Sequence, residues 1–120
     1  MRKLKNAELN RIDLDSFKQA PKSPLILVLD NVRSTHNVGS IFRTADAFRV
    51  KEIFLCGITA TPPHRDIRKT ALGATESVQW QYCENTIDAI ENLQSKGIVV
   101  LAVEQAEGST SLSDFNTLPL

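Results

Sequence analysis

The sequence predicts an α/β fold in which helices flank a mainly parallel sheet. Four short segments have the composition of strands, at residues 25–29, 52–56, 78–82 and 98–103, and the first and last are apolar throughout. Uninterrupted apolar runs of this length are typical of strands buried on both faces of a sheet. Between them lie segments whose apolar residues follow helical spacing. Alternation of strands and helices along a chain favours a layered fold with parallel strands.

Residues 1–24 are predicted to form a polar N-terminal helix or tail, and residues 25–120 the main domain. The first segment has no long apolar run, and Pro21 and Pro24 end it, because proline cannot continue a helix. After the first strand, the spacing of apolar residues predicts a helix that begins at Asn37. Asparagine is a preferred N-cap, since its side chain accepts a hydrogen bond from a free amide at the helix start.

The later elements are bounded by residues that commonly start or end helices. Two prolines are predicted to open a short helix that stops before a glycine. An asparagine or the threonine after it caps the next helix, which another glycine closes. In sequence order, these boundary residues are Pro62, Pro63, Gly73, Asn85, Thr86 and Gly97. The apolar segment at 98–103 is then predicted to be the fourth strand of the sheet.

Length and composition indicate one soluble domain. The chain has 120 residues, of which 42% are hydrophobic and 23% charged, which is enough to bury a core. No segment approaches the roughly 18 apolar residues of a membrane span, and the basic start lacks the apolar part of a secretory signal. Cys56 and Cys83 are far apart and in no spacing typical of metal or redox motifs. They are interpreted as buried thiols of a cytoplasmic protein, and no metal site is expected.

The distribution of charge is uneven although the net charge is zero. Residues 1–75 contain 13 Lys or Arg and 7 Asp or Glu, a balance of +6, whereas residues 76–120 contain 1 and 7, a balance of −6. An asymmetry of this kind suggests a polyanionic partner for the basic half, although two ordinary solvated faces would give the same pattern. In the acidic half, Trp80 and Tyr82 either belong to the core or stack on bases.

Three residues near the start of the first helix form a candidate anion-binding site. Gly39 and Arg43 are four residues apart and therefore share a helix face. Because helical side chains lean toward the N-terminus, Arg43 is predicted to run back over the bare Gly39 toward the helix start, where Asn37 lies. A guanidinium beside free helix amides is suited to bind a phosphate or another anion. Taken singly, the three have simpler interpretations as an N-cap, a close-packing residue and a solvated cation.

The same residues resemble a known family motif. Asn37, Gly39, Arg43, Thr44 and Ala45 are similar to the first motif of the SpoU/TrmH branch of the SPOUT RNA methyltransferases. The resemblance implies the α/β-knot fold, a homodimer, and transfer of a methyl group from S-adenosylmethionine to a ribose 2′-hydroxyl of tRNA or rRNA. It also implies that Arg43 helps to activate that hydroxyl, together with an RNA phosphate, and that Asn37 helps to hold the site together.

Two other basic or polar segments supply candidates for contact with RNA. Residues 67–77 are similar to the family's turn before its third strand, and the cations around them would meet the RNA backbone. A solvated basic helix is the simpler interpretation of the same segment. The loop before the first motif offers an asparagine and an arginine that would lie near the same RNA. The candidate RNA-binding residues are Asn31, Arg33, Arg65, Arg68 and Lys69.

The last part of the sequence supplies the candidate residues for cofactor binding. Residues 99–105 resemble the family strand whose end approaches S-adenosylmethionine, so Glu104 and Gln105 would border its adenosine; a strand that runs into a polar loop is the simpler interpretation. The family's second and third motifs, which include the C-terminal trefoil-knot segment, are missing from this sequence. We therefore expect an incomplete chain that is inactive on its own, and the alternative is a non-catalytic, dimerising, RNA-binding α/β module.

Overall fold

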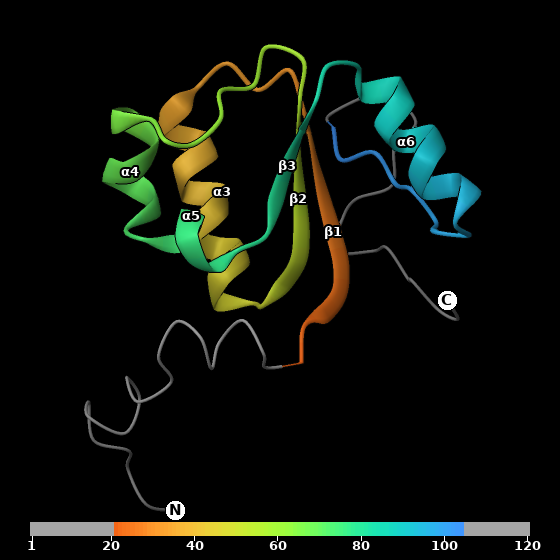
Figure 1. The fold of residues 1–120 in the computed structure, drawn as a ribbon, viewed down its shortest axis with the longest axis horizontal. Helices are drawn as coiled ribbons and strands as arrows, with labels where there is room; N and C mark the ends of the chain where they lie inside the picture. Colours follow the sequence, from red (N-terminus) through yellow and green to blue (C-terminus); the bar gives the residue numbers. More distant parts are fainter. Residues whose placement is uncertain (1–20, 105–120) are drawn as a thin grey trace, which may run out of the picture.

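The computed structural model describes residues 21–104. Its elements are, in order, β1 (Ser23–Asp30), α3 (Thr35–Ala47), β2 (Val50–Cys56), α4 (Arg65–Ala71), α5 (Ala74–Ser77), β3 (Trp80–Cys83) and α6 (Thr86–Ser95). The three strands form a parallel sheet in the order β1-β2-β3. Helices α3, α4 and α5 lie on one face of this sheet, and α6 lies on the other (Figure 1). The predicted α/β class with a parallel sheet is confirmed.

Alternation of side chains along the strands divides the core into two layers, because successive side chains of a strand point to opposite faces. Leu29 of β1 and Leu55 of β2 are partners in register, and both pack with Phe42 of α3 in the larger cluster. Phe54 of β2 instead packs with Leu93 of α6 in the second cluster. Each fully buried side chain of this size stabilises the fold by roughly 1.5–3 kcal/mol.

Helix α3 begins at Thr35, before the predicted start. Ser34 is its N-cap, and the Ser34 hydroxyl accepts a hydrogen bond of 3.0 Å from the backbone N–H of Asn37. The prediction that Asn37 caps this helix was wrong, because the serine hydroxyl already satisfies the amide that a cap must reach. Asn37 is instead a residue of the first turn with an exposed side chain. Among the described residues, that side chain makes no hydrogen bond.

Helix α4 begins after the two prolines rather than on them. His64 is its N-cap, and the ring Nδ1 of His64 accepts a hydrogen bond of 3.1 Å from the backbone N–H of Asp66. The prediction that Pro62 and Pro63 open the helix was wrong. A cap needs a side-chain acceptor for the first free amides, and proline has none. The helix stops before Gly73, as predicted.

Strand β3 and helix α6 follow in the predicted order. β3 starts later than predicted, because Val78 ends the short helix α5. Of the two predicted caps of α6, Asn85 is the N-cap, and its Oδ1 accepts a hydrogen bond of 2.9 Å from the backbone N–H of Ile87. Gly97 lies just past the end of α6 with φ 81°, a conformation that favours glycine and ends the helix.

The predicted fourth strand was wrong: residues 98–104 do not pair with any described strand. Ile98 and Val100 pack against the α6 side of the core, whereas Val103 is 88% exposed. Val99 and Leu101 are also exposed, at 63% and 55%, so burial in the described structure accounts for only part of the apolar pattern of this segment. The apolar run of residues suggested a strand. An apolar run does not show whether the backbone amides and carbonyls find partners on a neighbouring strand, and here they find none on a described strand.

Residues 1–20 and 105–120 lie outside the described residues, and with them most of the predicted N-terminal helix or tail. β1 begins at Ser23, slightly earlier than predicted. Within residues 21–104, no helix is long and apolar enough to cross a membrane.

Candidate functional site

A hollow of about 610 Å³ lies between α3 and α4, and we call it the α3–α4 hollow. It brings together two predicted site residues from different helices, Arg43 of α3 and Lys69 of α4, and both are exposed. An anion that entered this hollow would meet two positive side chains, which hold a phosphate more strongly than one does. The complete lining is His36, Ser40, Arg43, Thr44, Ala47, Phe48, Lys69, Thr70 and Leu72.

The two helices approach closely because α3 has Gly39 at their contact. A methyl group at Gly39 would overlap Thr70 Oγ1 and the carbonyl oxygen of Ile67. Thr70 also joins the helices, since its hydroxyl donates a hydrogen bond of 2.9 Å to the carbonyl oxygen of His36. The prediction that Arg43 runs back over Gly39 was therefore wrong. The space over Gly39 is filled by α4.

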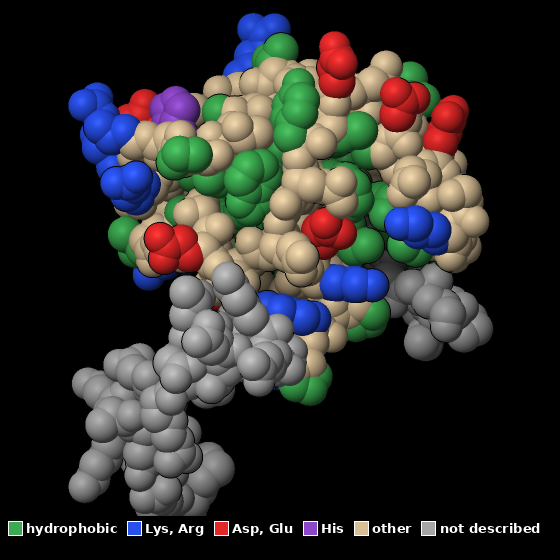
Figure 2. Space-filling view, viewed as in Figure 1, with side chains coloured by type: hydrophobic (Ala, Val, Ile, Leu, Met, Phe, Trp, Pro, Cys, Tyr) green, Lys and Arg blue, Asp and Glu red, His purple; other side chains and the backbone are tan. Residues whose placement is uncertain are grey.

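Positive side chains gather over α4, at the left of Figure 2. The Arg65 and Lys69 side chains are 86% and 67% exposed, and each lies 3.9 Å from the Asp66 carboxylate. Exposed ion pairs at such distances contribute at most about 1 kcal/mol to the stability of the fold. Both cations therefore remain available to a stronger partner such as an RNA phosphate.

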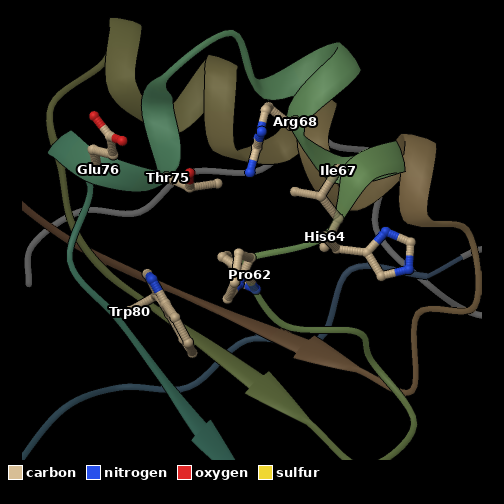
Figure 3. A pocket seen from close by; sticks show the side chains of 8 residues that line it. Pro62, His64, Ile67, Arg68, Thr75, Glu76 and Trp80 are labelled. Carbon is tan, nitrogen blue, oxygen red and sulfur yellow. The ribbon is translucent and has the colours of Figure 1, made fainter.

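A second hollow, of about 530 Å³, borders α4, α5 and β3, and we call it the Trp80 hollow. Figure 3 shows Arg68 extending from α4 into this hollow, with Trp80 of β3 on its other side. Trp80 packs partly against the core and is partly exposed, so its ring both belongs to the core and borders the hollow. The complete lining is Pro62, Pro63, His64, Ile67, Arg68, Thr75, Glu76 and Trp80.

The loop after β1 contains the two other candidate RNA contacts, which have different surroundings. Asn31 has a backbone φ of 53°. Its side-chain Oδ1 accepts a hydrogen bond of 2.9 Å from the backbone N–H of Ile58, and its Nδ2 donates a hydrogen bond of 3.0 Å to the Asp30 carboxylate. Asn31 thus joins the loops that follow β1 and β2. Arg33 is exposed and forms no ion pair within the described part of the chain, so its guanidinium is available to a ligand.

Glu104, the one candidate cofactor residue among residues 21–104, is not brought to the other site residues. Glu104 is exposed and belongs to the segment that runs beside α6, on the sheet face opposite α3 (Figure 1). Gln105 lies outside the described residues. For residues 21–104, there is also no group of three or more His, Cys, Asp or Glu side chains that could hold a metal ion.

Sequence reasoning missed part of the lining of the α3–α4 hollow. His36 lies on the same helix as Arg43 and Phe48 just past its end, whereas Thr70 and Leu72 lie on or next to α4. The signal that could have found the α4 residues was the interpretation of Gly39 as a close-packing residue, because a close approach requires a partner helix.

Comparison with known proteins gives a family and a fold. Residues 24–119 match the model of the SpoU rRNA Methylase family. A relative from Vibrio vulnificus, the 23S rRNA (guanosine-2′-O-)-methyltransferase RlmB, is 34% identical over 94 residues, which are 78% of this chain and 38% of the relative. This chain thus spans less than half the length of that curated relative.

Two solved structures are similar to this one. A putative RNA methyltransferase of the TrmH family from Porphyromonas gingivalis has a TM-score of 0.58 and 32% identity, over 65% of this chain and 31% of that one. The SpoU methyltransferase AviRb from Streptomyces viridochromogenes, solved in complex with the cofactor AdoMet, has a TM-score of 0.56 and 21% identity, over 75% and 34% of the two chains. The second likeness supports the fold alone.

Proposed function

Because this chain belongs to the SpoU rRNA methylase family, we propose that the protein transfers a methyl group from S-adenosylmethionine to a ribose 2′-hydroxyl of ribosomal or transfer RNA. The observation that supports this proposal is the convergence of Arg43 and Lys69 on the α3–α4 hollow. Arg43 belongs to the segment whose residues resemble the family's first motif, and the hollow gives it a second cation and an open approach for a polyanion.

The proposed role of Arg43 follows from the chemistry of the acceptor. A ribose 2′-hydroxyl is a poor nucleophile and must lose its proton as the methyl group moves. A guanidinium next to the adjoining phosphate fixes the ribose and stabilises negative charge that develops on the 2′-oxygen. Arg43 is the proposed catalytic residue, and Asn37, with an exposed side chain one turn or more before it, positions the nucleotide.

The remaining cations are proposed to hold the RNA backbone. Lys69 would share the α3–α4 hollow with Arg43, while Arg65 and Arg68 extend the basic surface along α4. Arg33 lies in the loop before α3 and is exposed. Asn31 is the weakest of these candidates, because both ends of its amide already make hydrogen bonds within the protein.

Neither hollow includes the described candidate neighbour of the methyl donor. Glu104 is exposed and lines neither the α3–α4 hollow nor the Trp80 hollow. We therefore propose S-adenosylmethionine from family membership, as the source of the methyl group, with Glu104 and Gln105 as candidate neighbours of its adenosine. A homodimer and a cytoplasmic location are proposed on the same basis.

Methyl transfer tests the proposal directly. A protein that carries this chain together with the family's second and third motifs is incubated with unmodified ribosomal and transfer RNA and with S-adenosylmethionine labelled in its methyl group. Label in alkali-resistant dinucleotides is expected, since a 2′-O-methyl group blocks cleavage of the next phosphodiester. Arg43→Ala should lower the rate by roughly 10²–10⁴-fold, whereas Lys96→Ala, an exposed cation at the end of α6, should leave it unchanged. Full activity of Arg43→Ala would overturn the assigned role.

A binding module without catalysis is the second candidate, because Arg43 and Lys69 line one hollow, whereas Glu104 lines neither that hollow nor the Trp80 hollow. Titration calorimetry with S-adenosylmethionine separates the two when the protein also carries the family's second and third motifs. Binding supports the enzyme. A folded protein of that length that binds RNA with a steep salt dependence but no S-adenosylmethionine supports the module.

A further inference from the structure

The chain's two cysteines, distant in the sequence, are direct neighbours in the sheet. Cys56 is the last residue of β2 and Cys83 the last residue of β3, and their Cα atoms are partners in the parallel register. Both are free thiols, and they pack in the same cluster on the α6 face. Residues that are partners in register point to the same face of a sheet, so the two thiols lie side by side.

We propose that Cys56 and Cys83 form a reversible intramolecular disulfide when the protein meets a peroxide. Neighbouring strands lie about 4.8 Å apart, and disulfides join Cα atoms roughly 4.4–6.8 Å apart. Both cysteines end their strands, so the bond would form at the edge of the sheet where the two loops begin. The bond would join β2 to β3 and close the loop of residues 56–83, which includes α4 and α5.

The two thiols have different surroundings, which gives the reaction an order. Cys83 is partly exposed, and its Sγ donates a hydrogen bond of 3.3 Å to the carbonyl oxygen of Asn85. Cys56 is fully buried. Burial raises the pKa of the Cys56 thiol, and the Cys83 thiol next to it raises it further. Cys83 is therefore the thiol that meets the oxidant first, since accessible thiolates react fastest.

The reaction balances with one peroxide. The Cys83 thiolate attacks a peroxide oxygen, the O–O bond breaks, and the departing hydroxide takes up the thiol proton to leave as water. Cys83 is then a sulfenic acid. Cys56 gives up its proton and attacks the Cys83 sulfur, the S–O bond breaks, and the hydroxyl leaves as a second water. The protein has lost two hydrogen atoms in all, and a dithiol reductant reverses the change.

The test uses the full 120-residue chain, in which no third cysteine can compete. The folded protein is treated with hydrogen peroxide at low excess, and free thiols and intact mass are followed on a monomer isolated without reductant. Both thiols should disappear together, with a mass lower by two hydrogen atoms, and dithiothreitol should restore them. In Cys83→Ser, the remaining buried thiol should stay reduced under the same treatment.

Three outcomes would overturn the proposal. Cys83 could gain oxygen while Cys56 stays a thiol, the disulfide could form only between chains, or it could form only after urea has unfolded the protein. Cys56→Ala serves as the second variant, and circular dichroism verifies its fold. In that variant Cys83 should accumulate oxygen adducts, because no resolving thiol remains.

Discussion

Replacement of Gly39 by alanine should destabilise the protein, although alanine is the better helix former. The gain from helix propensity is about 0.5–1 kcal/mol. Against it, the added methyl group would overlap Thr70 Oγ1 and the carbonyl oxygen of Ile67 and lie 3.1 Å from the amide nitrogen of Ala71. Overpacking of this kind costs roughly 1–3 kcal/mol, and two of the three obstacles are backbone atoms that cannot rotate away. We expect a net loss of about 1–2 kcal/mol.

Urea unfolding followed by circular dichroism measures this loss. For a urea m-value of about 1–2 kcal/mol/M, the midpoint should fall by roughly 1 M. Thr70→Ala in the Gly39→Ala background removes one of the three obstacles, so the double variant should be more stable than the sum of the single changes predicts. A neutral or stabilising Gly39→Ala would refute the close approach of α3 and α4, and with it the geometry of the α3–α4 hollow.

Three other predictions test the caps, the thiols and the Trp80 hollow. Ser34→Ala should destabilise the chain by about 1 kcal/mol through loss of the N-cap, whereas Asn37→Ala should change the midpoint of thermal unfolding little and lower RNA affinity. As pH rises from 7 to 9, alkylation by iodoacetamide followed by mass spectrometry should modify Cys83 before Cys56. The reason is that burial raises the pKa of Cys56, so its reactive thiolate forms only at higher pH, and equal rates would contradict this. Trp80 is the chain's one tryptophan, so single-stranded RNA that stacks in the Trp80 hollow should quench the protein's tryptophan fluorescence, and unchanged emission at saturating RNA would count against that contact.

The fold class could be predicted from the sequence because its signals are local. Apolar strand segments, Asn85 and Gly73 give element type and boundaries without knowledge of the rest of the chain. The start of α3 was misplaced because Ser34 and Asn37 are both good caps, and only the chain's path decides which side chain reaches a free amide. Residues 98–103 show that an apolar run alone does not predict a strand, since only Ile98 and Val100 pack against the core and the segment pairs with no described strand.

The candidate site was predictable residue by residue but not as an arrangement. Arg43 and Lys69 were identified separately, and nothing in the sequence places them at one hollow. Their meeting depends on the packing of α3 against α4, which is a long-range contact. The same holds for Cys56 and Cys83, whose separation in the sequence gave no signal until the register of β2 and β3 placed them together.

Gly39 determines the surroundings of Arg43. This gives a physical reason why both residues occur in the segment that resembles the family motif. Gly39 has no side chain where α3 meets α4, so the helices come close enough for Thr70 to bond to the carbonyl oxygen of His36. That approach puts Lys69 on the wall of the hollow that Arg43 lines. A larger residue at position 39 would separate the two cations without touching either. Gly39→Ala should therefore weaken RNA binding as well as stability, whereas the cap variant Ser34→Ala, which does not alter the contact of α3 with α4, should lower stability with a smaller loss of RNA affinity.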